Sequence, residues 1–421
     1  MHSRFPRYNE FDPRVPVWCV TPERTGCMHR FFDTSPISPS GRYLAVLQFP
    51  QEQRRPAPGE QAQVVLVDLE RDEDRVVATT HGWEGQMGAN INWGGSDEEL
   101  FFNDVDTASW TPFAWRLNVS TGEKVRLAGT VYHASPDGRW LVSANTATMR
   151  RTQPGYGVMI PEERMRWNVG LADDDGFYLT DAQSGACRLF ASIRELMTQA
   201  DPPVWFDPDE RIEVYGFHSK FSPRGDMLML SLRWFPAADT PRWDLFTHDC
   251  DAVRFAWIVV SLDKSVMHCA VGPEQWEKGG HHATWFPDST HISMNLAIDR
   301  GCMRLVQVRP DGSRLRTMRD DIIGSGHPTV SPDGTHVLTD TYTCEPSAFG
   351  DGTIPLRWID LRTGAEQTLV RINTAQPSPH PDMRVDPHPA WDRSGRYVTF
   401  NGFVGGTRRV FVADMSSLVS R

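Results

Sequence analysis

The sequence lacks the features that mark membrane, secreted and nucleic-acid-binding proteins. No stretch of its 421 residues approaches the ~18 consecutive apolar residues of a membrane-spanning helix. The first 16 residues contain no apolar run of the kind found in secretory signals, which predicts a cytoplasmic location. The net charge is −11 and the basic residues are scattered, so nucleic acid and membrane are not expected as partners.

Paired cysteines and long amphipathic helices are also missing. The seven cysteines are odd in number, dispersed and without a Cys-x-x-Cys pair, which predicts reduced core thiols instead of a disulfide framework. In contrast, 15 Trp, 21 Phe, 33 Gly and 31 Pro suit many short strands bounded by turns. This composition is typical of an all-β chain.

A repeated hairpin accounts for most of the sequence. In each copy, an apolar segment precedes a turn that resembles Ser-Pro-Asp-Gly, and alternating apolar residues follow. Pro presets φ, Asp can hydrogen-bond to its own backbone and Gly accepts a positive φ, so these residue types explain why the chain turns at these positions. Seven such turns occupy residues 38–41, 95–97, 135–138, 222–225, 287–289, 331–334 and 393–395.

Repeats of about 40 to 50 residues, with about four strands each, indicate a β-propeller. We predict an all-β fold, a single seven-bladed propeller over residues 1–421, with repeats at about 30–415 and an N-terminal segment that helps to close the ring. Turn spacings of about 40 to about 87 residues predict insertions in several blades, on one face. A short helix is expected at 193–200.

One insertion begins with Pro154-Gly155-Tyr156-Gly157 and continues as a charged run. It places Tyr156 on a loop. A tyrosine there is either a packing lid over the channel or a donor or acceptor of protons.

Four histidines share one position relative to the turns. His218, His282, His327 and His388 each lie seven residues before the last residue of a turn, although only 14 of the 421 residues are histidine. The innermost strand of each blade lines the channel, so equal offsets predict a partial ring of imidazoles at one end. A single histidine would more often be a satisfied structural residue, but the ring favours a functional site.

The most compact metal-ligand set in this ring comes from two adjacent blades. Asp386 lies two residues before His388, and side chains two apart on a strand share one side. With His327 they could bind a divalent metal, for which Mn, Zn and Ca are the candidates.

The remaining ring histidines and nearby arginines suggest acid–base chemistry on an anion. His218 and His282 are free to transfer protons near neutral pH. Arg233 and Arg384 can pair with a carboxylate, so an anionic oligo- or polysaccharide is the expected partner. Further substrate-binding candidates near the channel are His29, Arg30, Gln86, His133 and Arg384. For His29 and Arg30, the alternative is that they only cap loops where the ring closes.

Several of these segments resemble propeller-fold polysaccharide lyases. Residues 25–32, 279–285, 326–328 and 384–389 resemble oligogalacturonate lyases, whereas 154–157, 217–219 and 232–234 are more similar to lyases of ulvan and other rhamnose–glucuronate polymers. The resemblance covers most of the chain and implies β-elimination at a uronate in the central cleft.

The resemblance also implies roles for single residues. His282 matches the catalytic base of oligogalacturonate lyases, and His327 and His388 match metal ligands. That family has a His-x-His pair after a Gln. This chain has Asp386 in place of the first His and Met383 near the position of the Gln, which leaves the identity of the metal and the strength of its binding open. On the ulvan-lyase side, Tyr156 matches a tyrosine that serves as proton donor or base, and the metal can be structural.

The residues supply each role that β-elimination needs. Arg233 or a metal would neutralise the uronate carboxylate, His282 or His218 would take the C5 proton, and Tyr156 would protonate the leaving oxygen.

Two other functions stay open. A non-catalytic binding propeller similar to TolB would have no ordered histidine ring. A glycoside hydrolase would need two carboxylates across the cleft. Only Asp386 and Asp33 are candidates for such a pair.

Overall fold

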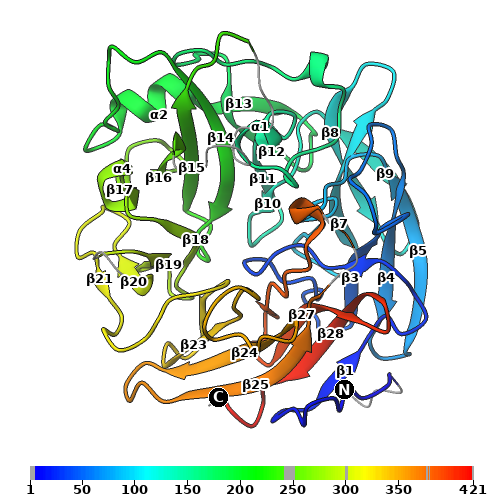
Figure 1. The fold of residues 1–421 in the computed structure, drawn as a ribbon. Helices are drawn as coiled ribbons and strands as arrows, with labels where there is room; N and C mark the ends of the chain where they lie inside the picture. The colour runs from blue at the N-terminus through cyan, green and yellow to red at the C-terminus, as the bar shows by residue number, and fades with distance from the viewer. Residues whose placement is uncertain (1–4, 241–251, 299–301, 376–377, 379, 420–421) are drawn as a thin grey trace.

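The computed structural model describes residues 5–240, 252–298, 302–375, 378 and 380–419. Its strands form seven four-stranded antiparallel sheets arranged as blades around a ring, which confirms the predicted seven-bladed β-propeller (Figure 1). The chain follows the ring from its blue to its red end, and both termini lie on the same side of the ring.

Six blades take four consecutive strands each, in chain order from the channel outward. Blades 1 to 3 consist of β2 Cys27–Met28, β3 Tyr43–Gln48, β4 Ala62–Asp68 and β5 Glu73–Thr80; β6 Asn92–Trp93, β7 Glu99–Asp106, β8 Thr111–Asn118 and β9 Lys124–Leu127; and β10 His133–Ala134, β11 Trp140–Ala144, β12 Gly176–Asp181 and β13 Cys187–Ser192. Blades 4 to 6 consist of β14 Ile212–Phe221, β15 Met227–Pro236, β16 Arg254–Ser261 and β17 Met267–Val271; β18 Gly280–Trp285, β19 Ile292–Leu296, β20 Arg304–Val308 and β21 Arg316–Thr317; and β22 Thr329–Val330, β23 His336–Thr339, β24 Thr353–Asp360 and β25 Glu366–Asn373.

Blade 7 joins the two ends of the chain. Its inner strands are β26 Ala390–Trp391, β27 Tyr397–Val404 and β28 Thr407–Asp414, and its outer strand is β1 Val17–Cys19. Val17 pairs with Ala413, so the N-terminal strand closes the ring on the last blade.

Each of the seven predicted turns connects the first strand of a blade to the second. In the turn between β22 and β23, the Ser331 hydroxyl donates to the Asp333 carboxylate at 2.6 Å, and Gly334 has a φ of 73°. Strands in a blade alternate in direction, so all seven turns lie at one end of the channel, here called the turn face. The connections from second to third strands, and from one blade to the next, lie at the opposite end, the loop face.

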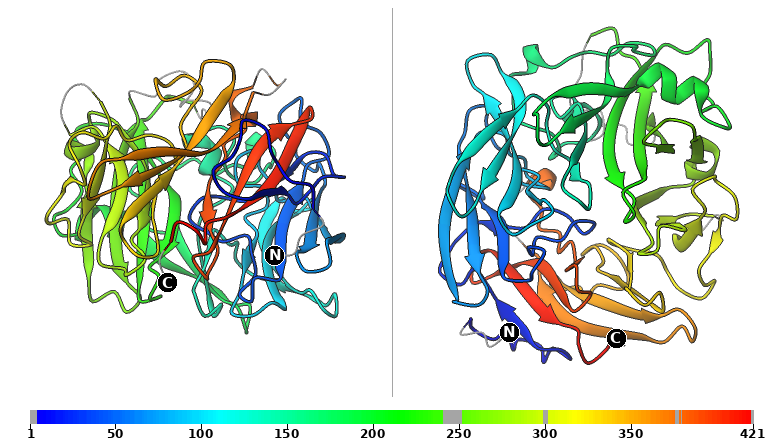
Figure 2. Two further views of the ribbon diagram at one scale, coloured as in Figure 1. Left: turned by 90° about the horizontal axis from the view of Figure 1, so that it is seen from below. Right: turned by 180° about the vertical axis from the view of Figure 1, so that it is seen from behind.

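The insertions lie on the loop face. The longest spans 145–175 between β11 and β12 and contains α1 Met149–Thr152 and η1 Glu162–Arg164. The connections between blades carry α2 Ile193–Gln199, α4 Pro273–Trp276 and η3 Pro381–Met383. The predicted helix at 193–200 is confirmed as Ile193–Gln199, and Ser192 caps its N-terminus by accepting a hydrogen bond from the Glu195 amide. Figure 2 shows these connections from two further directions.

Apolar side chains fill the spaces between blades, as Val64 and Leu100 do between blades 1 and 2. No helix among the described residues combines the length and apolar character needed to cross a bilayer. The six described cysteines are free, but Cys344 is exposed because it lies on the loop between β23 and β24. The prediction of core thiols is confirmed for Cys19, Cys27 and Cys269 and wrong for Cys344, whereas Cys187 and Cys302 are half-buried. Cys250 lies outside the described residues.

Candidate functional site

The four histidines of the ring surround one phenylalanine. The ring of Phe31 lies edge-on to them, with centroid distances of 5.4 Å to His218, 6.0 Å to His282, 5.7 Å to His327 and 4.6 Å to His388. Phe31 is fully buried, and all four imidazoles are buried or half-buried. The equal offsets in the sequence therefore correspond to one cluster, here called the histidine ring.

The backbone at the histidine ring departs from regular strand geometry. His282 has a φ of 57° and His388 a φ of 50°, in the left-handed region that non-glycine residues rarely adopt. Asn90, at the same offset in blade 2, has a φ of 50°. In β18 the pairing register shifts between His281 and Thr284, as at a β-bulge. Bulges turn side chains out of the strand alternation, and such strain is concentrated at functional sites.

A buried ion cluster holds Phe31 in the channel. Arg30 Nη1 lies 2.9 Å from Asp33 Oδ1, and Lys220 Nζ lies 2.7 Å from Asp33 Oδ2. Lys220 also donates to the Ala283 carbonyl at 2.6 Å. Burial opposes the charge of Asp33, but Lys220 and Arg30 hold the pKa of its carboxyl well below the usual range. The segment that carries Phe31 is thus anchored within the channel.

Two members of the histidine ring and a neighbouring aspartate are arranged like the ligands of a metal ion. One ligand atom from each of His327, Asp386 and His388 lies within 4.8 Å of the others. The Asp340 carboxylate lies 2.9 Å from His327 Nδ1, and His327 Nε2 has no hydrogen-bond partner among the described residues. A carboxylate that orients the far nitrogen of a histidine is the usual support for a metal ligand. Two imidazoles and a carboxylate suit Mn or Zn better than Ca, which prefers oxygen ligands.

His282 adjoins this group, with its ring centroid 4.0 Å from that of His327. Its Nδ1 lies 2.8 Å from the Gly326 carbonyl and 2.7 Å from His281 Nδ1. A carbonyl only accepts, so Nδ1 carries the proton and Nε2 keeps its lone pair. Burial, reinforced by His327 and His281, lowers the pKa of His282 well below its usual value. A neutral imidazole with a fixed tautomer can act as a general base.

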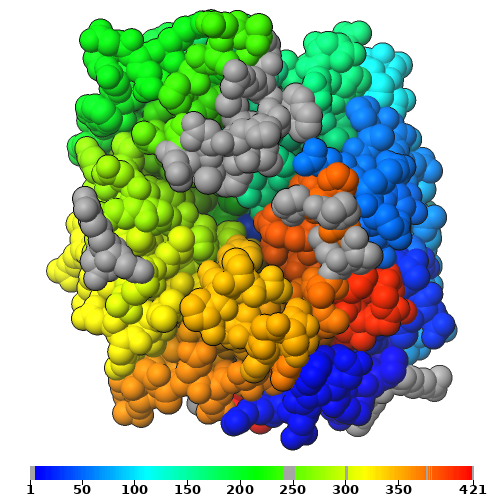
Figure 3. Space-filling view, in the orientation of Figure 1, coloured from blue at the N-terminus to red at the C-terminus, as the bar shows by residue number. Residues whose placement is uncertain are grey.

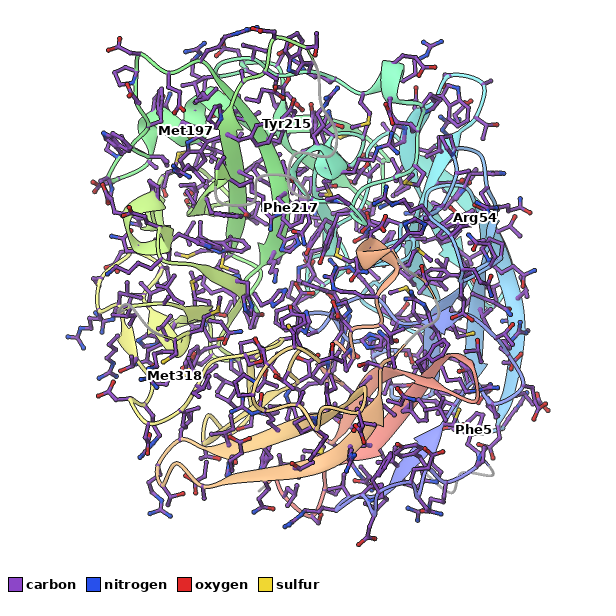
Figure 4. The ribbon with its side chains drawn as sticks, viewed as in Figure 1. Phe5, Arg54, Met197, Tyr215, Phe217 and Met318 are labelled. Carbon is purple, nitrogen blue, oxygen red and sulfur yellow. The ribbon has the colours of Figure 1, made fainter. Side chains whose placement is uncertain are left out.

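Tyr156 and Arg233 lie beside His218. The ring of Tyr156 is 5.0 Å from that of Phe217 and 5.8 Å from that of His218. Arg233 covers the face of Phe217 at 3.5 Å and donates to Gln153 at 2.6 Å. In Figure 4, Phe217 lies nearer the middle of the ring than Tyr215. Tyr156 is on a loop, as predicted, but only 2% exposed, and burial raises the pKa of its phenol.

Arg384 and Gln86 lie at the loop-face mouth of the channel. Arg384 Nε donates to Asp386 Oδ2 at 2.8 Å, and Gln86 Nε2 donates to the Asp382 carbonyl at 2.8 Å. The space-filling view shows a hollow near the middle of this face, beside the orange segment before β26 (Figure 3). A neighbouring groove of about 440 Å³ is lined in part by Arg55, Pro56, Pro154, Gly155, Ile160 and Asp382.

Two other predicted binding residues are occupied by protein groups. His29 is buried with Nε2 3.3 Å from the Pro387 carbonyl, and burial lowers the pKa of His29 to about 4. Arg30 donates to Asn90 at 3.2 Å in addition to its pairing with Asp33.

His133 is separated from the histidine ring. Its Nδ1 accepts from the Phe221 amide at 3.0 Å, and it lines a pocket of about 430 Å³ with Asp33 and Lys220. It lies five residues before Gly138, two fewer than the ring histidines, which moves it along the strand towards the turn face. Its role in substrate binding stays a prediction.

Sequence reasoning missed three residues of this site. Asp340 could have been found, because the turn at 331–334 sets a register in which Thr329 pairs with Leu338 and position 327 faces position 340. Tyr342, whose Oη lies 3.5 Å from His282 Nδ1, follows on an irregular loop that carries no such signal. Phe31 was within a segment noted for its polar neighbours, and nothing in the pattern placed it at the centre.

Comparison with known proteins shows the fold and not the activity. No protein-family model and no curated protein sequence matches the chain. An oligogalacturonate lyase structure from Vibrio parahaemolyticus matches with a TM-score of 0.64 and 14% identity, over 99% of this chain and 97% of that one. An oligogalacturonate lyase in complex with manganese matches at 0.63 and 15% identity, over 97% and 96%. TolB from Acinetobacter baumannii matches with a TM-score of only 0.40 and 10% identity, over 89% of this chain and 81% of that one.

Proposed function

We propose that this protein is a lyase that cleaves a uronic-acid glycosidic bond by β-elimination. The observation that carries the proposal is the position of His282, a neutral imidazole with Nδ1 bound to Gly326, whose ring lies 4.0 Å from that of His327 in a group able to bind a metal. A base next to a concentration of positive charge is what removal of a proton beside a carboxylate requires. The fold shared with two oligogalacturonate lyase structures is consistent with this chemistry.

The C5 proton of a uronate is weakly acidic, so its removal needs stabilisation of the charge that develops on the adjacent carboxylate. Arg384 is positioned for this, since Asp386 keeps it at the channel mouth and raises the pKa of its guanidinium against the effect of burial. Arg233 is a second cation, and burial lowers its pKa only to about 9. Both side chains would bind the substrate carboxylate in the ground state and in the transition state.

His327, Asp386 and His388 would hold a divalent metal, which supplies a Lewis acid for the same carboxylate when bound. The manganese in one of the oligogalacturonate lyase structures is consistent with this assignment. Asp340 would fix the orientation of His327 for that role.

The acceptor of the C5 proton would be His282 Nε2. His218, with its Nε2 lacking a hydrogen-bond partner among the described residues, is the second candidate base and comes from the adjacent blade 4. The proposed substrates are oligo- or polysaccharides that contain galacturonate or glucuronate, including ulvan-type polymers.

The experiment is a rate measurement on a panel of oligogalacturonides, ulvan and a rhamnoglucuronan, following the ultraviolet absorbance of the unsaturated product. His282→Ala is expected to lower the rate by roughly 10²- to 10⁴-fold on the best substrate. His218→Ala tests the second candidate in parallel. Binding without any increase in absorbance, across the whole panel and with added Mn²⁺ or Zn²⁺, would favour a non-catalytic binding propeller and refute the proposal.

A further inference from the structure

Tyr342 is the phenol nearest to the proposed base. Its Oη lies 3.5 Å from His282 Nδ1, and its ring centroid lies 5.9 Å from that of His327. This separation is at the outer limit of a hydrogen bond, but catalytic hydrogen bonds are often long without substrate and shorten when it binds. Tyr342 is partly exposed as a whole residue, but burial of its phenol raises the pKa of the hydroxyl well above the usual value, so the proton stays on Oη until it is transferred.

The loop that carries Tyr342 is held by a set of hydrogen bonds. The Thr341 hydroxyl donates to Glu345 at 2.6 Å and lies 2.8 Å from the Ser325 hydroxyl. The Tyr342 amide faces the same Glu345 carboxylate at 3.4 Å. Ser325 precedes Gly326, the residue that fixes the tautomer of His282, so one network positions both the phenol and the imidazole.

Tyr156, the phenol suggested by the sequence, is placed differently. It is 2% exposed and its ring contacts are with Phe217 and His218. Among the described residues its ring contacts are with His218 and not with His282, whereas the Tyr342 hydroxyl lies 3.5 Å from His282 Nδ1.

We propose that Tyr342 is the general acid of the elimination and that His282 returns the proton to it. The proposal rests on the proposed lyase function. His282 Nε2 takes the C5 proton, and the electrons of the C5–H bond first delocalise onto the adjacent carboxylate. They then form the C4–C5 double bond as the C4–O4 bond breaks and O4 takes the proton of the Tyr342 hydroxyl. The imidazolium then passes its Nδ1 proton to the Tyr342 phenolate. Exchange with water restores the starting tautomer, which the Gly326 carbonyl favours.

The test separates the two halves of the reaction with Tyr342→Phe, which keeps the ring and removes one oxygen. Elimination is followed by product absorbance. Proton removal is followed by deuterium uptake at C5 of recovered substrate in D₂O. Tyr342→Phe is expected to lower elimination by roughly 10²- to 10⁴-fold while C5 exchange persists, and His282→Ala to abolish both. Tyr43→Phe, a tyrosine that stacks on Trp93, is the matched control and should leave both rates unchanged.

The outcomes are distinct. Elimination by Tyr342→Phe within threefold of the parent protein overturns the inference, as does joint loss of elimination and exchange, because the phenol would then not act at the leaving oxygen. Loss of elimination in Tyr156→Phe, with Tyr342→Phe active, assigns the acid to Tyr156 and also overturns it. Absence of both activities in the parent protein refutes the proposed lyase function itself.

Discussion

Replacement of Phe31 by alanine should damage the site more than it damages the fold. Phe31 is fully buried, lies 4.7 Å from the ring of Phe32, and contacts the imidazoles of four blades. Deletion of a buried phenylalanine side chain costs about 3–5 kcal/mol of unfolding free energy. The cavity would be bordered by four imidazoles as well as by apolar residues such as Phe32, so water can enter and hydrogen-bond there, which favours the lower end, about 3 kcal/mol.

Phe101→Ala is the matched control for Phe31→Ala. Phe101 is equally buried, but its cluster between blades 2 and 3 consists of apolar residues. A dry cavity there should cost about 4–5 kcal/mol. Urea unfolding followed by tryptophan fluorescence measures both losses, and product absorbance measures turnover of the folded proteins.

The two variants should separate in activity. Phe31→Ala is expected to lower kcat/KM by about 10²-fold, because misplacement of catalytic groups by about 1 Å has effects of that size, whereas Phe101→Ala should retain the parent rate. Equal activity of the two variants, or a stability loss below about 1 kcal/mol for Phe31→Ala, would refute the idea that Phe31 organises the histidine ring.

Three further predictions concern the surroundings of the ring. Asp340→Asn should weaken Mn²⁺ or Zn²⁺ binding by about 10- to 100-fold, because His327 loses its orienting carboxylate; unchanged affinity in titration calorimetry would argue against the metal group. Lys220→Met should lower the unfolding free energy by about 3–5 kcal/mol, because Asp33 loses one of its two buried cations. Adding Asp33→Asn to this variant should restore part of the lost stability. If the effects of the two substitutions on the unfolding free energy simply add, the two side chains are not coupled and the prediction is contradicted. The folded-state pKa of His29 is about 4, below the ordinary 6.5, so the unfolded chain binds more protons between these pH values. Stability should fall by on the order of 3 kcal/mol as pH drops through this window, and an unchanged pH dependence of urea unfolding in His29→Gln would contradict this.

The blade architecture could be predicted because it depends on local chemistry. A turn such as 331–334 uses Pro, Asp and Gly at fixed places, and each of the seven turns keeps part of this pattern. The equal offsets of His282 and His388 also follow from the repeat. Residues at the same distance in sequence from the turn lie at the same level along the channel in every blade, so the equal offsets bring the histidines together.

The details of the site depended on features that have no local signal. A bulge and a positive φ turn His282 out of the strand alternation, and neither follows from its neighbours in sequence. Phe31 reaches the centre because Asp33 pairs with Lys220, which lies 187 positions later in the chain. Long-range pairs of this kind, and irregular loops such as that of Tyr342, are decided by tertiary packing.

The most direct test of the proposed function is the mass of the product released from a defined uronate oligosaccharide. β-Elimination breaks the bond without adding water, so one fragment should carry a double bond and be one water molecule lighter than the corresponding hydrolysis product. The account predicts this lighter, unsaturated fragment with the parent protein and its absence with His282→Ala. Release of two saturated fragments, with the mass of water added, would show hydrolysis and contradict the account.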